Sequence, residues 1–278
     1  MDINSCQVQK IVAQAIAEDV GHSDLTTFNL FSPDARGQGC FLAKDEGVIA
    51  GLPVAKMVFE KLDPNMVWNG LINDGEYVKS GMILARFSGS LQAILSGERV
   101  ALNFLQRLSG IAAKTHGYVQ ETIGYPVKIV DTRKTTPGLR ILEKYAVKTG
   151  GGSNHRFGLY DAVMLKDNHI KAAGSITRAM TILRAQLPFT IKIEVETENL
   201  NMVQEALDNK ADIIMLDNMS LELMARAVEL VNGRALVEAS GGITIDNVRK
   251  VAATGVDIIS VGALTHSVKA LDISLELD

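Results

Sequence analysis

Compact apolar runs, each closing on a polar or glycine residue, follow one another from Pro126 to near the end of the chain. The last four end at Glu196, Asp217, Ser240 and Gly262, at intervals of 21, 23 and 22 residues. Helix-like stretches separate them, and this alternation of strand and helix is typical of a parallel sheet. The steady interval favours an α/β barrel, closed or partly open. A doubly wound sheet is less favoured, because no GxGxxG sequence follows an early strand.

The first part of the chain has a different pattern. Short strand-like runs at 39–51 and 78–89 alternate with Gly and Asp turns, as in antiparallel hairpins. Residues 96–123 then place apolar side chains at helical spacing, which predicts one long helix, or a pair of helices, linking the two parts. Residues 1–21 are patterned as an amphipathic helix and not as a signal peptide, since they lack an uninterrupted apolar core.

Alternation within one strand predicts a charged face. In TIKIEVE (190–196) the apolar side chains share one face, and Lys192, Glu194 and Glu196 share the other, because successive strand residues point to opposite sides. A barrel strand of this kind carries a charged row on its inner side. Lys192 and Glu194 fit a purely structural pair as well as a functional role. Glu196 lies nearest the C-terminal end of its strand and is the stronger functional candidate.

Composition narrows the class of protein. The chain has 278 residues, 47% hydrophobic and 22% charged, which suffices for one large globular domain or two ordinary ones. Cys6 and Cys40 form neither a disulfide framework nor a thiolate metal site, so a reducing cytoplasm fits best. No run of about 18 apolar residues predicts a membrane span. A net charge of −4 without a basic stripe argues against a nucleic-acid partner.

Positive charge is nevertheless concentrated in one segment, DTRKTTPGLRILEKYAVKTGGGSNHRFGLYDAVMLKDNHI (131–170). Seven Lys and Arg side chains stand there against four Asp and Glu, with His155 and His169 in addition. His155 follows a triple glycine in a loop, where a buried structural role is less expected than on a helix. His169 fits a supporting role near the site or a turn-stabilising one, and is not favoured as catalytic. The local excess of cations predicts a site for anions.

A helix is predicted in the middle of this segment. Thr136 is its expected cap, Pro137 its first residue and the glycines at 150–152 its end. Lys144 and Lys148 are one turn apart on this helix and are expected to face solvent.

The residues that end the apolar runs are the main candidates for function, because active sites of α/β barrels form at the C-terminal ends of the strands. They form a cationic group and an acidic group around the expected opening at the C-terminal end of the barrel. They are Arg133, Lys134, Lys166, Glu196, Asp217, Ser240, Gly241, Gly242 and Gly262. A salt bridge with a purely structural role explains a charged residue at the end of any one strand. It explains poorly why so many strands end on charged residues.

Two glycine turns on the last two strands, at 240–242 and 261–263, predict a phosphate site. Glycine lets backbone N–H groups approach a phosphate closely, and a following helix N-terminus favours negative charge. Glu196 and Asp217 end neighbouring runs, and two carboxylates can hold Mg²⁺, directly or through water, against phosphate oxygens.

With these residues assembled, the chain resembles the quinolinate phosphoribosyltransferase family. The matching stretches are ERVALNFLQRLSGIA (98–112), the block at 131–169, IEVE (193–196), IMLDN (214–218), EASGGI (238–243) and VGALTHS (261–267). They run across nearly the whole chain, and the block at 131–169 is long enough to be highly specific.

The resemblance implies an α/β protein with an N-terminal α/β sandwich domain (1–110) and an open, incomplete α/β barrel (111–278). The last residues either stay with the barrel or return to the first domain. It further implies a cytoplasmic enzyme that transfers the phosphoribosyl group of phosphoribosyl pyrophosphate to the ring nitrogen of quinolinate. Loss of CO₂ then gives nicotinate mononucleotide for NAD synthesis. Mg²⁺ is the implied cofactor, and a homodimer or higher multiple with shared active sites is the implied assembly.

Site roles follow from the same motif match. The implied catalytic residues are Lys134, Lys166, Glu196 and Asp217. The last two would serve the ribose hydroxyls and Mg²⁺, with Glu194 as an alternative to Glu196, and Arg99 would come from the neighbouring subunit. The implied substrate-binding residues are Arg99, Thr132, Arg133, Lys134, His155, Arg156, Lys166, Glu196, Asp217, Ser240, Gly241, Gly242, Val261, Gly262 and Ala263.

Three alternatives stay open from the sequence. A related barrel phosphoribosyltransferase, associated with molybdenum transport, would use another acceptor. An aldolase would use Lys166 to form a Schiff base with a carbonyl substrate. A non-catalytic binding or regulatory protein would keep the fold, although Glu196, Asp217 and the glycine turns have no evident use in a scaffold.

Overall fold

The computed structural model describes residue 3 and residues 5–278; the start of the expected N-terminal helix and domain, at residues 1, 2 and 4, lies outside the described residues. The chain divides into two compact units. The first contains residues 1–116, 135–151 and 264–278, and the second contains residues 117–134 and 152–263. The functional segment at 131–170 therefore contributes to both units.

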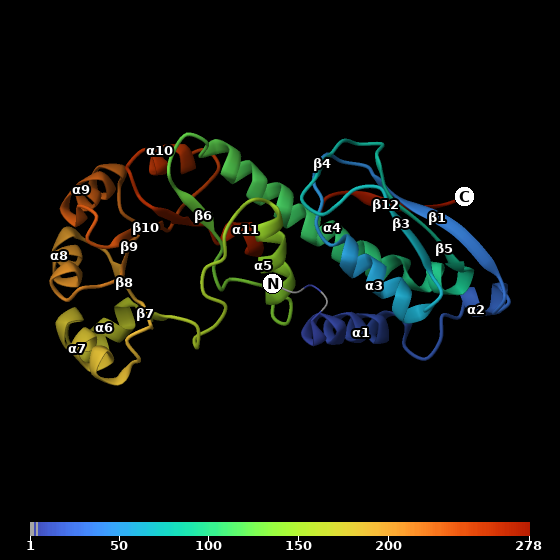
Figure 1. Cartoon of the computed structure of the whole chain (residues 1–278), viewed down its shortest axis with the longest axis horizontal. Coiled ribbons are helices and arrows are strands. Elements are labelled where there is room, and N and C mark those ends of the chain that lie inside the picture. Colours follow the sequence, from blue (N-terminus) through green and yellow to red (C-terminus); the bar gives the residue numbers. More distant parts are fainter. Residues whose placement is uncertain (1–2, 4) are drawn as a thin grey trace. The chain divides into compact units, whose positions relative to one another are not determined.

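The first unit combines helices with antiparallel strands (Figure 1). Its elements are α1 (Cys6–Val20), α2 (Thr27–Leu30), β1 (Arg36–Ala43), β2 (Gly47–Val48), α3 (Leu52–Leu62), β3 (Val67–Gly70), β4 (Tyr77–Val78), β5 (Ile83–Ser90), α4 (Leu91–Glu121), α5 (Arg140–Thr149), α11 (Ala263–His266) and β12 (Ile273–Leu277), with α4 and α11 crossing its limits. The main sheet has the order β12-β1-β5-β3, all antiparallel, as the hairpin-rich pattern predicts.

An aromatic cluster forms the core of the first unit. Phe41, Phe59, Trp68 and Phe87 contact one another with ring centroids 4.9 to 6.5 Å apart. These distances are typical of favourable aromatic pairs. The cluster joins β1, β3 and β5 to helix α3, so the sheet buries one face against a helix, as in an α/β sandwich.

The long helix of the sequence analysis is a single helix, α4, of 31 residues. Its buried residues include Leu105, Leu108 and Ala112, at the intervals of three and four that define one helical face. The predicted N-terminal helix is also present as α1, with Val8 and Val12 buried at i and i+4.

Helix α5 differs from its prediction in two ways. It begins at Arg140, whereas residues 137–139 form a turn in which Gly138 has φ +83° and so cannot continue a helix from Pro137. Its predicted end at Gly150 is confirmed. Lys144 was expected to face solvent, and this prediction is wrong: its side chain is fully buried, as is that of Glu143. Consecutive helical residues point about 100° apart, so more than one face of α5 is covered.

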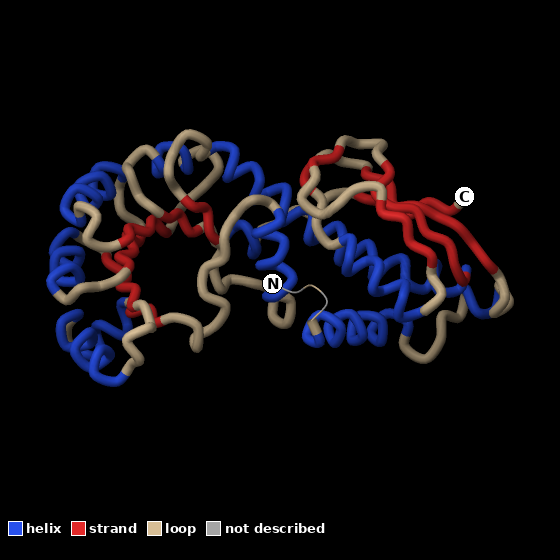
Figure 2. The backbone as a smooth tube through the Cα atoms, in the orientation of Figure 1, coloured by secondary structure: helices blue, strands red, loops and turns tan. Residues whose placement is uncertain are grey.

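The second unit is a parallel sheet with helices on its outer side (Figure 2). Its elements are β6 (Lys128–Val130), β7 (Val163–Leu165), α6 (Asp167–Ala173), α7 (Ile176–Gln186), β8 (Ile193–Thr197), α8 (Leu200–Asp208), β9 (Ile213–Asp217), α9 (Leu221–Val231), β10 (Leu236–Ser240), α10 (Val248–Ala252) and β11 (Ile258–Ser260). The helices alternate with the strands from β7 onward, as the repeating interval predicts.

The strand order is β6-β11-β10-β9-β8-β7, and every pair is parallel. Figure 2 shows the strands as a curved inner layer that does not close. The predicted α/β class with an open barrel is confirmed. Because all strands run the same way, their C-terminal ends meet at one edge, and Ser240 lies directly beside Asp217 in the register of β10 and β9.

The alternation predicted for TIKIEVE is present in β8. Ile193 and Val195 are fully buried, and Glu194 and Glu196 point to the other face. Lys192 precedes the strand and is exposed, while Glu194 contacts His155. Among the described residues, no helix is long and apolar enough to cross a membrane.

Candidate functional site

A cavity of about 660 Å³ lies at the C-terminal ends of the strands of the second unit. This volume is in the range of small-molecule sites. Its lining combines cationic, acidic and glycine residues from successive strand ends. The lining residues are Thr132, Arg133, Lys134, His155, Arg156, Met164, Lys166, Glu196, Met215, Asp217, Asn218, Glu238, Ser240, Gly241, Gly242 and Ser260.

Of the substrate-binding residues that the sequence nominated, all but four line this cavity. Val261, Gly262 and Ala263 are outside its lining, where Ser260 represents the last strand instead. Arg99 belongs to the first unit, is exposed on α4, and is also outside the lining.

Five lining residues were not nominated by the sequence analysis: Met164, Met215, Asn218, Glu238 and Ser260. Glu238 carried a usable signal. It is a charged residue inside the apolar run ALVEAS and shares a strand face with Ser240 two residues later. In the sequence, Met164 and Met215 have the pattern of ordinary core residues. Nothing in that pattern distinguishes a strand residue that borders a cavity from one that is packed in the core.

Lys166 and Glu196 form the closest contact between the cationic and acidic sides. Lys166 follows β7, and its Nζ lies 2.7 Å from Oε2 of Glu196 at the end of β8. The backbone N–H of Lys166 donates to Nδ1 of His169, 3.1 Å away, at the start of α6. His169 therefore stabilises the turn that carries Lys166, which is one of the two roles that the sequence left open.

Arg156 is held by its neighbours within the second unit. Its Nη1 donates to the carbonyl of Ala162 at 2.8 Å, and its Nη2 contacts the sulfur of Met164. Partial burial, together with the nearby positive charge of Arg133, lowers the pKa of Arg156. Two guanidinium groups this near to each other favour an anion between them.

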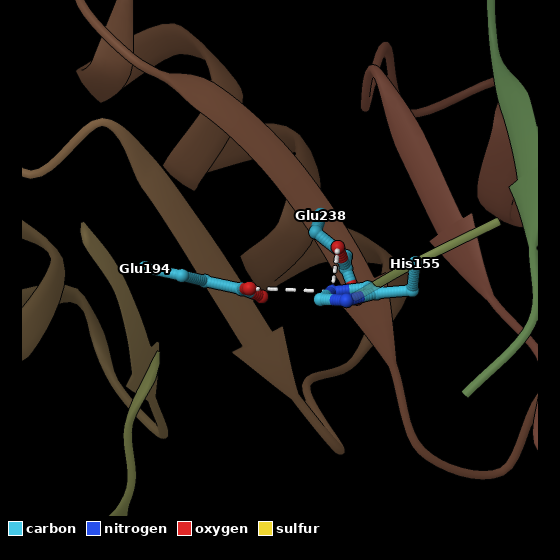
Figure 3. A group of neighbouring side chains, drawn as sticks. All are labelled: His155, Glu194 and Glu238. Carbon is cyan, nitrogen blue, oxygen red and sulfur yellow. Dashed lines mark ion pairs between the residues drawn. The ribbon is translucent and has the colours of Figure 1, made fainter. Parts of the chain in front are cut away.

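His155, Glu194 and Glu238, termed here the acid–histidine cluster, meet at the wall of the cavity, which His155 and Glu238 line. Figure 3 shows the three side chains pointing toward one another. Nε2 of His155 lies 3.2 Å from Oε2 of Glu194 and 3.3 Å from Oε2 of Glu238. Burial alone would lower the pKa of His155, but the two carboxylates outweigh it and raise this pKa to about 10. Burial, and the nearby charge of Glu238, raise the pKa of Glu194 although His155 opposes the change.

The acidic side continues from β8 to β9. Asp217 ends β9, and its Oδ2 accepts a hydrogen bond from the side chain of Asn218 at 2.9 Å. Asn218 has φ +52°, a left-handed conformation that asparagine tolerates better than most residues, and its N–H donates to the carbonyl of Ser240. This turn fixes the end of β9 against the glycine turn of β10.

Glycine is required at position 241. Its φ is +88°, and a Cβ there would come within 2.2 Å of Oδ1 of Asn218. Gly242, at φ +61°, has nothing within 4 Å of the position that a Cβ would take, so only the backbone conformation restricts it. The turn therefore brings backbone, not side chains, to the wall of the cavity.

The donor set suits a divalent cation that prefers oxygen ligands. The contacts of Glu196 with Lys166 and of Asp217 with Asn218 use Oε2 and Oδ2, and they do not use Oε1 or Oδ1. Mg²⁺ is usually held by one or two carboxylates, with water and substrate phosphate completing its shell. Glu196 and Asp217, on neighbouring strands and in one cavity, fit that requirement.

Taken together, the fold and cavity define an open α/β-barrel protein with a site for anionic small molecules, lined by both cationic and carboxylate side chains. Comparison with known families gives the particular class. Residues 24–109 match the N-terminal domain of quinolinate phosphoribosyl transferase, and residues 111–276 match its C-terminal domain. The chain belongs to the quinolinate phosphoribosyltransferase family.

Relatives agree in sequence and in structure. A probable nicotinate-nucleotide pyrophosphorylase (carboxylating) of Synechocystis is 51% identical over 95% of this chain and 90% of its own length. Its Bacillus subtilis counterpart is 45% identical over 99% and 95%. The crystal structure of NadC from Streptococcus pyogenes superposes with a TM-score of 0.97 at 43% identity, covering 100% of this chain and 99% of that one.

Proposed function

We propose that this protein transfers the phosphoribosyl group of phosphoribosyl pyrophosphate to the ring nitrogen of quinolinate and releases pyrophosphate and CO₂. The product is nicotinate mononucleotide, a precursor of NAD. The observation that carries the proposal is one cavity lined by Arg133, Arg156 and Lys166 together with Glu196 and Asp217. A dianionic acceptor suits the first group, and a ribose with its metal-bound pyrophosphate suits the second.

The cationic side binds and orients quinolinate, whose two adjacent carboxylates can pair with several cations. Each charge-assisted hydrogen bond contributes about 1.5–3 kcal/mol. Arg133 and Arg156 suit planar carboxylates because a guanidinium can donate two parallel hydrogen bonds. Lys134 is exposed and adjacent to Arg133, a position from which it can serve either substrate. Burial of the acceptor between these groups and the strand ends brings its ring nitrogen toward the ribose.

Decarboxylation needs little further machinery. Once the ring nitrogen carries the ribose it is formally positive, and the carbanion left by departing CO₂ is stabilised beside it. The C–C bond to the carboxylate breaks, its electron pair stays on the ring carbon, and a proton then adds there. The task of the protein is positioning and electrostatic support.

Mg²⁺ is part of the proposal. Glu196 and Asp217 would hold it, directly or through water, together with the ribose hydroxyls. The metal would neutralise pyrophosphate charge as that group leaves. Backbone N–H groups of the 240–242 turn would take the phosphate on the ribose, with residues 261–263 as further candidates. Glu194 is a weaker candidate for the metal than Glu196, since it contacts His155 and is almost fully buried.

The direct test supplies quinolinate, phosphoribosyl pyrophosphate and Mg²⁺, and measures CO₂ and nicotinate mononucleotide. Formation of both in equal amounts, dependent on Mg²⁺, is expected. Failure to form either product would overturn the proposal. The names of the relatives favour quinolinate over another acceptor, and the same assay with carbonyl compounds and borohydride trapping tests the aldolase alternative at Lys166.

The glycine turn gives a separate prediction. Gly241→Ala should raise the KM for phosphoribosyl pyrophosphate by about tenfold, because its methyl group displaces Asn218 from the turn that ends β9. Gly233→Ala is the matched control. Gly233 has φ +71°, and no atom lies within 4 Å of the position that a Cβ would take. We expect this variant to lose only about 1–2 kcal/mol of stability. Steady-state kinetics and thermal unfolding measure the two effects. An equal KM change in both variants would contradict a specific role for the turn.

A shared site between two subunits belongs to the proposal as well. Arg99 belongs to the first unit and is exposed there, so its side chain is accessible to a neighbouring subunit. Mixing Arg99→Ala subunits with Lys166→Ala subunits should regenerate some intact sites. No recovery of activity, after proven subunit exchange, would place a complete site within one chain.

The location of the enzyme belongs to the proposal too. Cys6 is exposed and Cys40 buried, and both are free thiols, which supports the cytoplasm as a reducing compartment.

A further inference from the structure

The acid–histidine cluster is not explained by the proposed chemistry. Quinolinate is a dianion, yet Glu238 lines the same cavity as the cations that would bind it, and Glu194 and Glu238 both contact His155 (Figure 3). Glu194 is 2% exposed and Glu238 is 0% exposed. Among the described residues, Oε1 of Glu194 and Oε1 of Glu238 have no hydrogen-bond partner, and the contact recorded for Oε2 of Glu238 is its ion pair with His155. Leaving a buried polar group unsatisfied costs about 1–3 kcal/mol, so a specific use for these groups is expected.

A metal ion is the first candidate occupant. Within the described part of the chain, this is the one group of three such side chains whose ligand atoms lie within 4.8 Å of one another. The hydrogen bond on the other ring nitrogen argues against it. Nδ1 of His155 accepts the backbone N–H of Arg156 at 2.7 Å. A histidine that binds metal through Nε2 carries its proton on Nδ1, where it would meet that N–H.

The same hydrogen bond assigns the proton of the neutral ring to Nε2, between the two carboxylates. Against the effect of burial, the two carboxylates favour a second proton on the ring and raise the pKa of His155. That proton would sit on Nδ1, facing the N–H of Arg156 at 2.7 Å, so the hydrogen-bond geometry favours a ring whose one proton is on Nε2.

Other charges around the ring are consistent with this arrangement. Asp131, which follows β6, accepts the backbone N–H of His155 at 2.9 Å and so fixes the backbone from the opposite side. Arg156 is the next residue, and its pKa is lowered by burial and by the charge of Arg133, which outweigh the opposite effect of Glu194. The ring thus has a fixed partner at each nitrogen, acidic at Nε2 and backbone amide at Nδ1.

We infer that Glu238, together with Glu194, is a positioning residue: the buried carboxylates hold the proton of His155 on Nε2, so that Nδ1 can hold the backbone of Arg156 and place its guanidinium in the cavity. The inference rests on the proposed function, in which Arg156 binds a carboxylate of quinolinate. A carboxylate that fixes the tautomer of a histidine is a well-known arrangement, and its replacement by an amide can select the wrong tautomer.

Glu238→Gln tests this, because an amide can donate to Nε2 and thereby favour the proton on Nδ1. We expect the KM for quinolinate to rise about tenfold to 100-fold, with the KM for phosphoribosyl pyrophosphate unchanged. A purely local charge effect predicts the opposite sign, since removing negative charge near a dianion should tighten its binding. Glu229→Gln, exposed on α9, is the matched control and should behave like the parent protein.

A spectroscopic readout separates positioning from general destabilisation. In ¹⁵N-histidine-labelled parent protein, the His155 signal, identified by its loss in His155→Asn, should show Nδ1 unprotonated and Nε2 protonated at neutral pH. In Glu238→Gln a fraction of the ring should carry the proton on Nδ1. If this variant does not fold, the parent spectrum alone decides, because a proton on Nδ1 there overturns the inference.

A double-mutant cycle tests whether the effect passes through Arg156. In an Arg156→Ala background, Glu238→Gln should leave the KM for quinolinate unchanged or lower it. The same rise in both backgrounds, or a fall in the single variant, overturns the inference. The proposed function fails differently: if Arg156→Ala alone leaves the KM for quinolinate unchanged, the role of Arg156 is wrong whatever the tautomer of His155.

Discussion

Nicotinate is expected to react at least about 10⁴-fold more slowly than quinolinate, measured as kcat/KM with phosphoribosyl pyrophosphate and Mg²⁺ present. Nicotinate lacks the carboxylate beside the ring nitrogen. In its complex, cations placed to meet two carboxylates would find only one, and a buried polar group left without its partner costs far more than a missing apolar contact. Arg133, Arg156 and Lys166, which line the cavity, are the cations that we propose for this role.

The measurement uses both acids at matched concentrations and follows formation of nicotinate mononucleotide, which is the product in either case. Benzoate, which has a carboxylate but no ring nitrogen, controls for simple inhibition by carboxylates. Comparable turnover of nicotinate and quinolinate would contradict the assignment of the cationic side to a dianion.

Lys166→Ala is expected to lower kcat/KM for quinolinate by about 10²–10³-fold. The side chain of Lys166 follows β7, and its Nζ lies 2.7 Å from Oε2 of Glu196. Lys166 therefore joins a cation of the cavity to one of its carboxylates. Its removal takes away a charge-assisted donor and leaves the carboxylate of Glu196 without its counter-ion. Both changes destabilise the complex in which the ring nitrogen of quinolinate and the ribose are aligned for reaction.

Lys148→Ala provides the matched control, because Lys148 is exposed on α5 and does not line the cavity. It should retain the activity of the parent protein. Unchanged kcat/KM in Lys166→Ala, with thermal unfolding similar to the parent, would remove Lys166 from the site. A loss of similar size in Lys148→Ala would show that the effect is not specific to the cavity.

The local pattern of apolar and polar residues predicted the barrel strands well, because each strand is a short continuous run whose limits are visible in the sequence. The runs ending at Glu196, Asp217 and Ser240 are strands β8, β9 and β10, and their ends do meet at one edge. Parallel strands require this, since the polypeptide must return through a helix before each one. The common edge therefore followed from the order of elements alone.

Local patterns failed where a residue is surrounded by segments remote in sequence. Lys144 was placed at the surface because charge on a helix usually marks the exposed face, yet α5 is covered on more than one side. The start of the same helix was placed too early, because Pro137 suits a first turn but Gly138 adopts a left-handed conformation. For Lys144 the packing around the helix outweighed the local pattern, whereas at Gly138 the backbone freedom of glycine outweighed the preference of proline for a first turn.

By itself, the sequence determined the α/β class, the repeating strands of an open barrel and the cationic and acidic residues at their ends, because periodicity specifies which face of an element each side chain occupies. Only the tertiary structure decided which of these faces meet. It placed Glu238 of β10 and Glu194 of β8 both against Nε2 of His155. Such contacts join segments far apart in the chain, so no local pattern encodes them.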